Sequence, residues 1–253
     1  MPLLFQYRDI VNEELPLEDW KKEACLAFAS KMSNREARFP CIPATHAFAQ
    51  GHLRYSFVSH PWSGSAGREM AEILAEYGRS SRSFGDYSSL VIFFEPEEEI
   101  RSVLEYENVF WSLLSDVSQL DSMPWPEDIP EDPHQPMWEF CYEDERYFVY
   151  CGTPAHHARQ SRSFPYFMLA LTPRWVLTRW NANPQKAAAI APRIRSRLKA
   201  YDAVPAHPEL KQYGAQGNLE YKQYFLRDDD TSPGGCPFHR AALKARAEDE
   251  TVK

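Results

Sequence analysis

The chain has 253 residues, a length that suits one large domain, and 43% of them are hydrophobic, which allows a core with an internal pocket. Its net charge of −8 argues against general nucleic-acid binding, because affinity for phosphate depends on clustered cations. The first 20 residues lack the basic start and long apolar core of a signal peptide, and no apolar run is long enough to cross a bilayer, so we expect a soluble cytoplasmic protein with no membrane partner.

The spacing of apolar residues predicts the elements of the first half of the chain. Apolar positions recur at helical intervals over 17–33, 64–78 and 97–120, which predicts three helices. The residues at 53–58 alternate and are rich in β-formers, and 88–94 is a nearly continuous apolar run. We therefore expect two strands there, the second of them buried in the centre of a sheet.

The second half of the chain is predicted to begin with a loop and to continue mainly as strands. Five prolines in residues 123–136 exclude a helix or a central strand there. After it we expect a hairpin of strands 137–142 and 146–151, strands at 165–172 and 174–180, and a helix that starts at Asn183-Pro184. This order predicts an α+β fold, a single domain over 1–253 with a largely antiparallel sheet flanked by helices. The tail at 241–253 is a candidate for disorder.

Two adjacent histidines, His156 and His157, follow the second hairpin strand, and Arg159 and Arg162 come just after them. Imidazole is a common axial ligand of haem iron, and arginine pairs with carboxylates such as the haem propionates. One short segment could therefore bind a haem by its metal and by its acid groups. The alternative is a hydrogen-bonded core histidine beside a surface one, with both arginines in ordinary surface ion pairs.

The cysteines offer weaker candidates. Five of them at irregular spacing do not form a disulfide framework. Cys236 could ligate haem as a thiolate, or form half of a zinc site with His239, but no second half-site of familiar spacing exists. Cys41, with Phe39 before it and His46 and His52 after it, could line a pocket next to the strand at 53–58. A small buried hydrophobe remains the alternative for Cys236.

Several stretches together resemble the YqcI/YcgG family over about residues 35–240. They are FPCIPA (39–44), LRYSFV (53–58), SSLVIFFEP (88–96), PWPEDIPEDP (124–133), WEFCYEDERYFVYCGTPAHHARQSR (138–162), TPRWVLTRW (172–180), IRSRLKAYDAVPAHPEL (194–210), EYKQYFL (220–226) and GCPF (235–238). The run 138–162 is the specific one. The sequence departs from the more usual family pattern after FPC, where Pro43 and His46 stand, which bears on the identity of the substrate more than on the cofactor.

The resemblance implies an enzyme with haem b in an internal pocket that hydroxylates a nitrogen, in the best-known members converting L-arginine to Nω-hydroxy-L-arginine. The family's Thr-Pro-Ala-His element falls on His156, which the resemblance makes the axial iron ligand, with His157 as the alternative. Arg159 and Arg162 match basic residues expected to hold propionates. Cys41 and Cys236 match recurrent family cysteines whose roles the resemblance does not give.

The implied chemistry sets further expectations. A cationic guanidinium needs carboxylates, so Glu139 and Glu220, and more weakly Cys41 in the pocket region, are candidates for contact with substrate, although each glutamate could equally be a structural ion-pair partner. Dioxygen or peroxide would supply the oxygen atom. No nucleotide-binding motif is present, so electrons would come from an external donor. The alternatives to an enzyme are a haem-binding sensor or carrier without turnover, and a structural domain whose histidines lie in the core.

Overall fold

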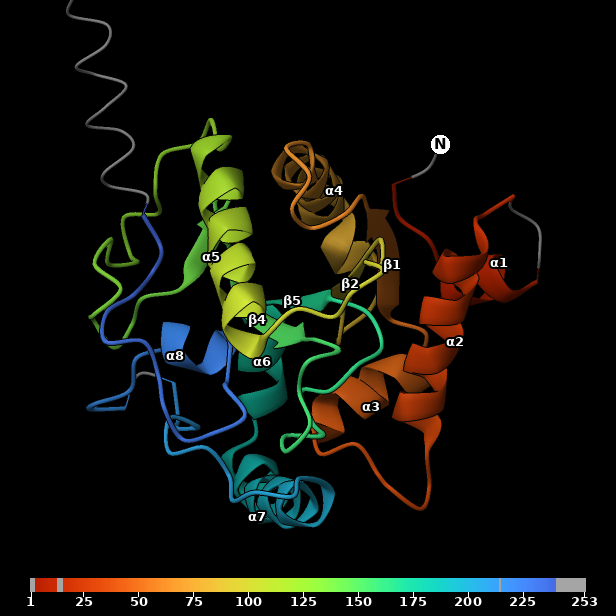
Figure 1. Ribbon diagram of the computed structural model, residues 1–253. Helices are drawn as coiled ribbons and strands as arrows, with labels where there is room; N and C mark the ends of the chain where they lie inside the picture. The colour runs from red at the N-terminus through yellow and green to blue at the C-terminus, as the bar shows by residue number, and fades with distance from the viewer. Residues whose placement is uncertain (1–2, 13–15, 214, 240–253) are drawn as a thin grey trace, which may run out of the picture.

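The computed structural model describes residues 3–12, 16–213 and 215–239, and its elements surround one five-stranded sheet (Figure 1). The strands are β1 (Leu53–Val58), β2 (Ser89–Phe94), β3 (Phe140–Tyr142), β4 (Glu145–Gly152) and β5 (Met168–Pro173). The helices are α1 (Tyr7–Val11), α2 (Asp19–Ser33), α3 (Ile42–Ala49), α4 (Ala66–Ser80), the short 3₁₀ helix η1 (Ser81–Ser83), α5 (Val103–Gln119), α6 (Arg174–Asn181), α7 (Pro184–Tyr201) and α8 (Tyr221–Tyr224).

The sheet is mixed, with strand order β1-β2-β5-β4-β3. β1 and β2 are parallel, because helix α4 carries the chain back between them. The three remaining pairs are antiparallel, and β3 and β4 form a hairpin whose turn residues Glu143 and Asp144 have φ angles of 46° and 63°. The prediction of a largely antiparallel sheet was therefore wrong at the β1-β2 edge, where the helical crossover was not recognised as a parallel connection.

Each face of the sheet is covered by its own group of helices. On one face α4, α5 and α8 pack against alternating strand residues such as Leu90, Ile92 and Leu169. On the other face α2 and α3 pack against residues of the opposite parity, including Val91, Phe93 and Met168. All six residues of β2 are buried, as expected for a strand covered on both faces.

Most predicted elements are confirmed, but one predicted strand is a helix in the structure. The strands at 53–58 and 88–94, the hairpin, and the helices at 17–33 and 64–78 are present with small shifts of their ends. The predicted helix 97–120 begins only at Val103, and Ile100 before it is exposed. The predicted strand 174–180 is helix α6, in which the buried residues Val176 and Trp180 lie one turn apart on the same face.

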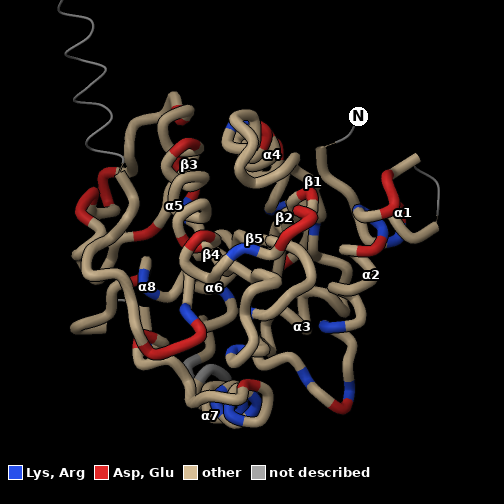
Figure 2. Tube along the Cα trace, viewed as in Figure 1, with Lys and Arg blue, Asp and Glu red and all other residues tan. Residues whose placement is uncertain are grey.

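Lys and Arg residues gather along α7 at one edge of the molecule (Figure 2), and the side chains of Arg193, Arg195 and Lys199 are exposed. Across the described part of the chain, no helix combines the length and the apolar character that crossing a membrane requires. The tail 241–253, a candidate for disorder, lies outside the described residues.

Candidate functional site

A cavity of about 170 Å³ lies between the sheet and the helices of the α2-α3 face. Its floor is formed by strand residues of a single parity, including Ser89 and Val91 of β2 and Ala170 and Thr172 of β5. The small side chain of Ala170, in the middle of an otherwise bulky strand, leaves part of this space open. The cavity therefore follows directly from the pattern of side-chain size along the central strands.

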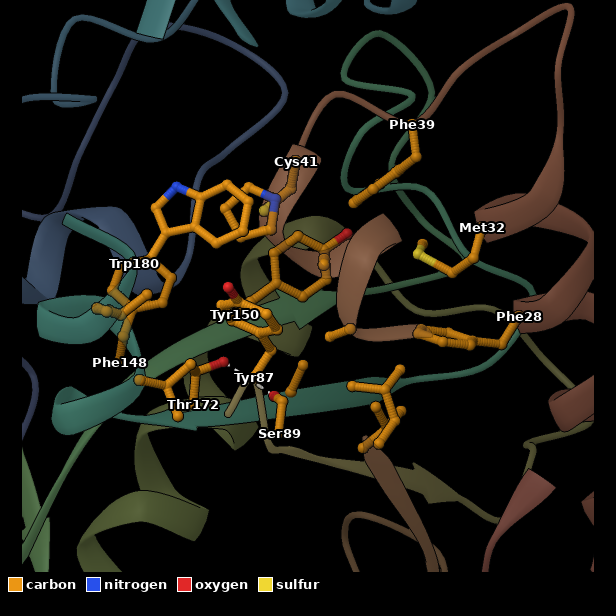
Figure 3. A pocket seen from close by; sticks show the side chains of 18 of the residues that line it. Phe28, Met32, Phe39, Cys41, Tyr87, Ser89, Phe148, Tyr150, Thr172 and Trp180 are labelled. Carbon is orange, nitrogen blue, oxygen red and sulfur yellow. Dashed lines mark hydrogen bonds between the residues drawn. The ribbon is translucent and has the colours of Figure 1, made fainter. Parts of the chain in front are cut away.

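The walls of the cavity are almost entirely apolar and aromatic. Figure 3 shows Phe28, Met32 and Phe39 on one side and Phe148 and Trp180 on the other, above the sheet. The hydroxyl groups of Ser89 and Thr172 hydrogen-bond to each other at 2.8 Å on the floor, so they satisfy part of their own bonding needs. Among the described lining residues no carboxylate is present, which makes these walls unsuited to pair with a cationic guanidinium.

Two lining residues carry reactive or charged groups. Cys41 is the N-cap residue of α3 and lines the cavity. Burial raises the pKa of its thiol. Lys31 of α2 donates from Nζ to the carbonyl oxygens of Gln160 and Ser163 at 2.9 and 2.8 Å. Burial lowers the pKa of Lys31 to about 8. One of its three N–H donors is thus left for another acceptor.

An aromatic group stands beside the cavity around Tyr87. The rings of His46 and Trp180 lie 4.8 and 5.3 Å from the ring of Tyr87, and the ring of His52 stacks on it at 6.0 Å. The predicted pocket next to the strand 53–58 is therefore confirmed for Phe39 and Cys41, which line the cavity. The rings of His46 and His52 contact Tyr87, but neither residue is among those that line the cavity.

His156 is placed in the core, on the other side of the sheet from this cavity. Its side chain is 1% exposed, its ring lies 5.5 Å from the ring of Phe225, and both ring nitrogens have protein partners at 2.8 Å. Nε2 donates to the carbonyl oxygen of Leu226, so Nδ1 carries no proton and accepts from the hydroxyl of Thr153. Burial lowers the pKa of His156 to about 4. The neighbouring His157 is exposed.

Arg159 and Arg162 are both buried, and most of the groups that accept their hydrogen bonds lie in the C-terminal part of the chain. The guanidinium of Arg159 donates to the carbonyl oxygens of Pro205, Arg227 and Asp229 and to the carboxylate of Asp230. The guanidinium of Arg162 donates to the carbonyl oxygens of Cys151, Gln223 and Tyr224. None of His156, Arg159 and Arg162 lines the cavity, so the described residues do not support the expectation of a haem pocket around this segment.

Glu139 and Glu220, the candidates for binding a substrate guanidinium, both bind the guanidinium of Arg174. Both glutamates are almost completely buried; Arg174 Nε donates to Glu139, and Nη2 donates to Glu220 at 2.6 Å. The ring of Tyr213 covers the guanidinium at 3.7 Å. Although burial acts to lower the pKa of Arg174, the two carboxylates raise it above its usual range. Here the carboxylate pair binds an internal arginine at the start of α6.

The remaining candidate, Cys236, lies on the α4-α5 side of the sheet, where it packs against the core. Burial raises the pKa of its thiol to about 12. In the described ranges no three histidine, cysteine, aspartate or glutamate side chains gather as a metal site, so nothing there completes the half-site of Cys236 and His239.

Comparison with known proteins places the chain in a family. The sequence profile of the YqcI/YcgG family matches residues 28–239. The chain belongs to this family. It is 43% identical to the uncharacterized protein YqcI of Bacillus subtilis over 94% of this chain and 95% of that protein. It is 44% identical to the uncharacterized protein YcgG of the same organism over 90% of each.

A more distant relative of this YqcI/YcgG protein bears a functional name. It is DcsA of Streptomyces lavendulae, provisionally named an N(omega)-hydroxy-L-arginine synthase, which is 27% identical over 88% of this chain and 85% of that protein. No solved structure matches the chain. The family resemblance read from the sequence is thus confirmed.

Sequence reasoning missed most of the residues that form the cavity. Tyr87, Tyr150, Thr172 and Trp180 were not among the candidates, because each looks like an ordinary strand or helix residue on its own. The available signal was the placement of small or hydroxyl-bearing residues, such as Ser89 and Ala170, inside otherwise bulky apolar strands. Such positions leave space above a sheet, but only the fold shows that α2, α3 and α6 enclose it.

Proposed function

We propose that this protein is a haem-dependent oxygenase that hydroxylates a nitrogen of an amine or guanidine, with L-arginine as the favoured substrate. The observation that carries the proposal is the family membership together with the name of DcsA, which assigns that relative the synthesis of N(omega)-hydroxy-L-arginine. The apolar cavity adds physical support, because it is a place where a flat apolar cofactor could lie away from water.

The apolar chemistry of the cavity lining suits a macrocycle better than it suits a free arginine. Haem b is a planar and largely apolar macrocycle with two carboxylate arms, and the cavity offers aromatic walls with the Lys31 ammonium as the one cationic group among its described lining residues. Its volume of about 170 Å³ is below the roughly 300–1,000 Å³ of pockets that hold drug-sized ligands. We therefore expect the rings beside it, Tyr87 and Trp180, to move apart when a macrocycle binds.

When bound, haem would supply the activation of dioxygen or peroxide. The chemistry balances if one oxygen atom enters an N–H bond of the substrate and the other leaves as water, with two electrons and two protons from an external donor. Peroxide would supply both the oxygen atom and the electrons. The role of the chain is to exclude water with its aromatic walls and to hold the cofactor against the α2-α3 face.

The test begins with protein expressed with a haem supply. We expect a Soret band that shifts when L-arginine is added, and a product one oxygen atom heavier than arginine by mass spectrometry. Ala170→Trp fills the cavity floor and should abolish the Soret band, whereas Ala200→Trp at an exposed position of α7 should leave it unchanged. A Soret band with no hydroxylated product from arginine, lysine or simple amines would overturn the proposal in favour of a sensor or carrier.

A further inference from the structure

The cavity between the sheet and helices α2, α3 and α6 is too small for a macrocycle unless its walls move apart, but it has room for a smaller molecule. Its volume of about 170 Å³ is slightly above the roughly 150 Å³ of an engineered apolar cavity that holds benzene. A single aromatic ring therefore fits without movement of the walls. The remaining space is enough for one small substituent on that ring.

The walls of the cavity suit a neutral aromatic ring. Phe28 lies on one side of the space and Phe148 and Trp180 lie on the other (Figure 3). Aromatic side chains hold a ring by offset and edge-to-face contacts as well as by burial. Lys31 is the one cationic residue among the described lining residues, and its ammonium donates to two backbone carbonyl oxygens. A neutral ligand therefore suits this lining better than a charged one.

The floor of the cavity carries a hydrogen-bond acceptor without a donor. Ser89 Oγ donates to the carbonyl oxygen of Leu171 at 3.1 Å, which uses the only proton of this hydroxyl. The 2.8 Å bond between Ser89 and Thr172 must therefore be donated by Thr172. The Oγ1 atom of Thr172 keeps its lone pairs, and within the described ranges no group donates to it. A ligand with one O–H or N–H group would supply the missing donor.

We propose that this cavity binds a neutral molecule of the phenol class, with one aromatic ring and one O–H or N–H group that donates to Thr172 Oγ1. The ring lies between Phe28 on one side and Phe148 and Trp180 on the other. This site goes beyond the proposed function and does not depend on it. A macrocycle needs the walls to move apart, whereas a molecule of the phenol class needs them where they are.

The test measures the binding of phenol and of toluene to the full chain, expressed without a haem supply, by isothermal titration calorimetry. The two molecules are alike in size and shape, but only phenol can donate a hydrogen bond. Both should bind to the wild-type protein. Thr172→Val removes the acceptor and keeps the shape of the side chain, so it should weaken the binding of phenol about three- to tenfold without weakening that of toluene. Thr172→Ser keeps the hydroxyl and should bind phenol as the wild type does.

A second pair of variants locates the site. Ala170→Trp fills the cavity floor and should abolish the binding of both molecules, whereas Ala200→Trp on α7 should leave it unchanged. The inference is overturned if the wild type does not bind phenol, if Thr172→Val binds phenol as tightly as the wild type, or if folded Ala170→Trp still binds it. If Ala170→Trp does not fold, the comparison of phenol with toluene in Thr172→Val decides alone. The proposed function is tested separately, by product formation in haem-loaded protein.

Discussion

At the scale of single residues, Arg174 forms ion pairs with two buried glutamates. Its guanidinium lies between the buried carboxyl groups of Glu139 and Glu220 and donates to both. The planar fork of an arginine can meet two carboxyl groups at once, which offsets part of the cost of burying them. The arrangement also holds the start of α6, which supplies part of the cavity wall.

We expect Arg174→Met to lower the free energy of unfolding by about 3–5 kcal/mol, because it leaves two buried carboxylates without a cation. Arg174→Lys should lie between, since one ammonium cannot reproduce the two-sided contact. Urea denaturation measures both, with Arg79→Met at an exposed ion pair as the matched control, for which we expect less than about 1 kcal/mol. A loss of stability for Arg174→Met as small as that of the control would mean that the ion pairs of Arg174 with Glu139 and Glu220 do not stabilise the fold.

At the same scale, the sequence could predict which residues carry chemistry but not where their partners lie. His156, Arg159 and Arg162 stand together in the chain in a pattern that suits a cofactor. Arg159 binds Pro205 and Asp230, which are 46 and 71 residues away along the chain, and His156 binds Leu226, which is 70 residues away. No local sequence pattern predicts such distant partners. Cys41 was named as part of a pocket because it precedes the strand 53–58, and this local argument is confirmed.

At the scale of elements, the close approach of α4 and α5 depends on one glycine. Gly67 is buried in α4, and a Cβ atom there would lie 2.7 Å from Cβ of Asp116 in α5. A helical glycine normally invites replacement by alanine, which gains about 1 kcal/mol of helix propensity. The Cβ atom of Asp116 is attached directly to the backbone and cannot rotate away, so crowding opposes the gain in helix propensity.

We therefore expect Gly67→Ala to be destabilising by about 1–3 kcal/mol, as overpacking between helices usually is. Gly64→Ala is the matched control, because a Cβ at that position meets nothing within 4 Å, and it should be neutral. Chemical denaturation of both variants checks this. Equal stability of the two would mean that α4 can move away from α5 without cost.

Element types followed from the sequence wherever pattern and propensity agreed, and failed where they disagreed. The residues of α6 are rich in β-formers, yet Val176, Leu177 and Trp180 make a helical face toward the cavity. Packing decided against local propensity. The parallel pairing of β1 and β2 could have been inferred from the helix between them, because a helical crossover commonly returns the chain for a parallel neighbour.

At the scale of the whole molecule, the C-terminal segment closes the fold over strands that are far earlier in the chain. α8 packs against β4, the hydroxyl of Tyr224 donates to the carbonyl of Tyr147, and its oxygen accepts from the N–H of Phe140. His156 and the two arginines add the contacts to residues 205–230 described above. Because these bonds join distant parts of the chain, losing them should weaken global stability rather than one local turn.

The protonation of His156 makes this closure sensitive to pH. Its pKa is about 4 in the folded protein against an ordinary value of 6.5, because burial disfavours the imidazolium. Between these two values the unfolded chain binds a proton that the folded chain does not, so the free energy of unfolding falls as the pH is lowered below 6.5. The difference between these two pKa values corresponds to roughly 3 kcal/mol of stability, and most of this stability is lost by pH 4.

We expect urea denaturation to show that the stability advantage of wild type over His156→Gln shrinks by about this amount between pH 7 and pH 4. An advantage that stays constant across this range would mean that His156 titrates alike in the folded and unfolded protein, and that its buried bonds to Thr153 and Leu226 do not hold the neutral ring.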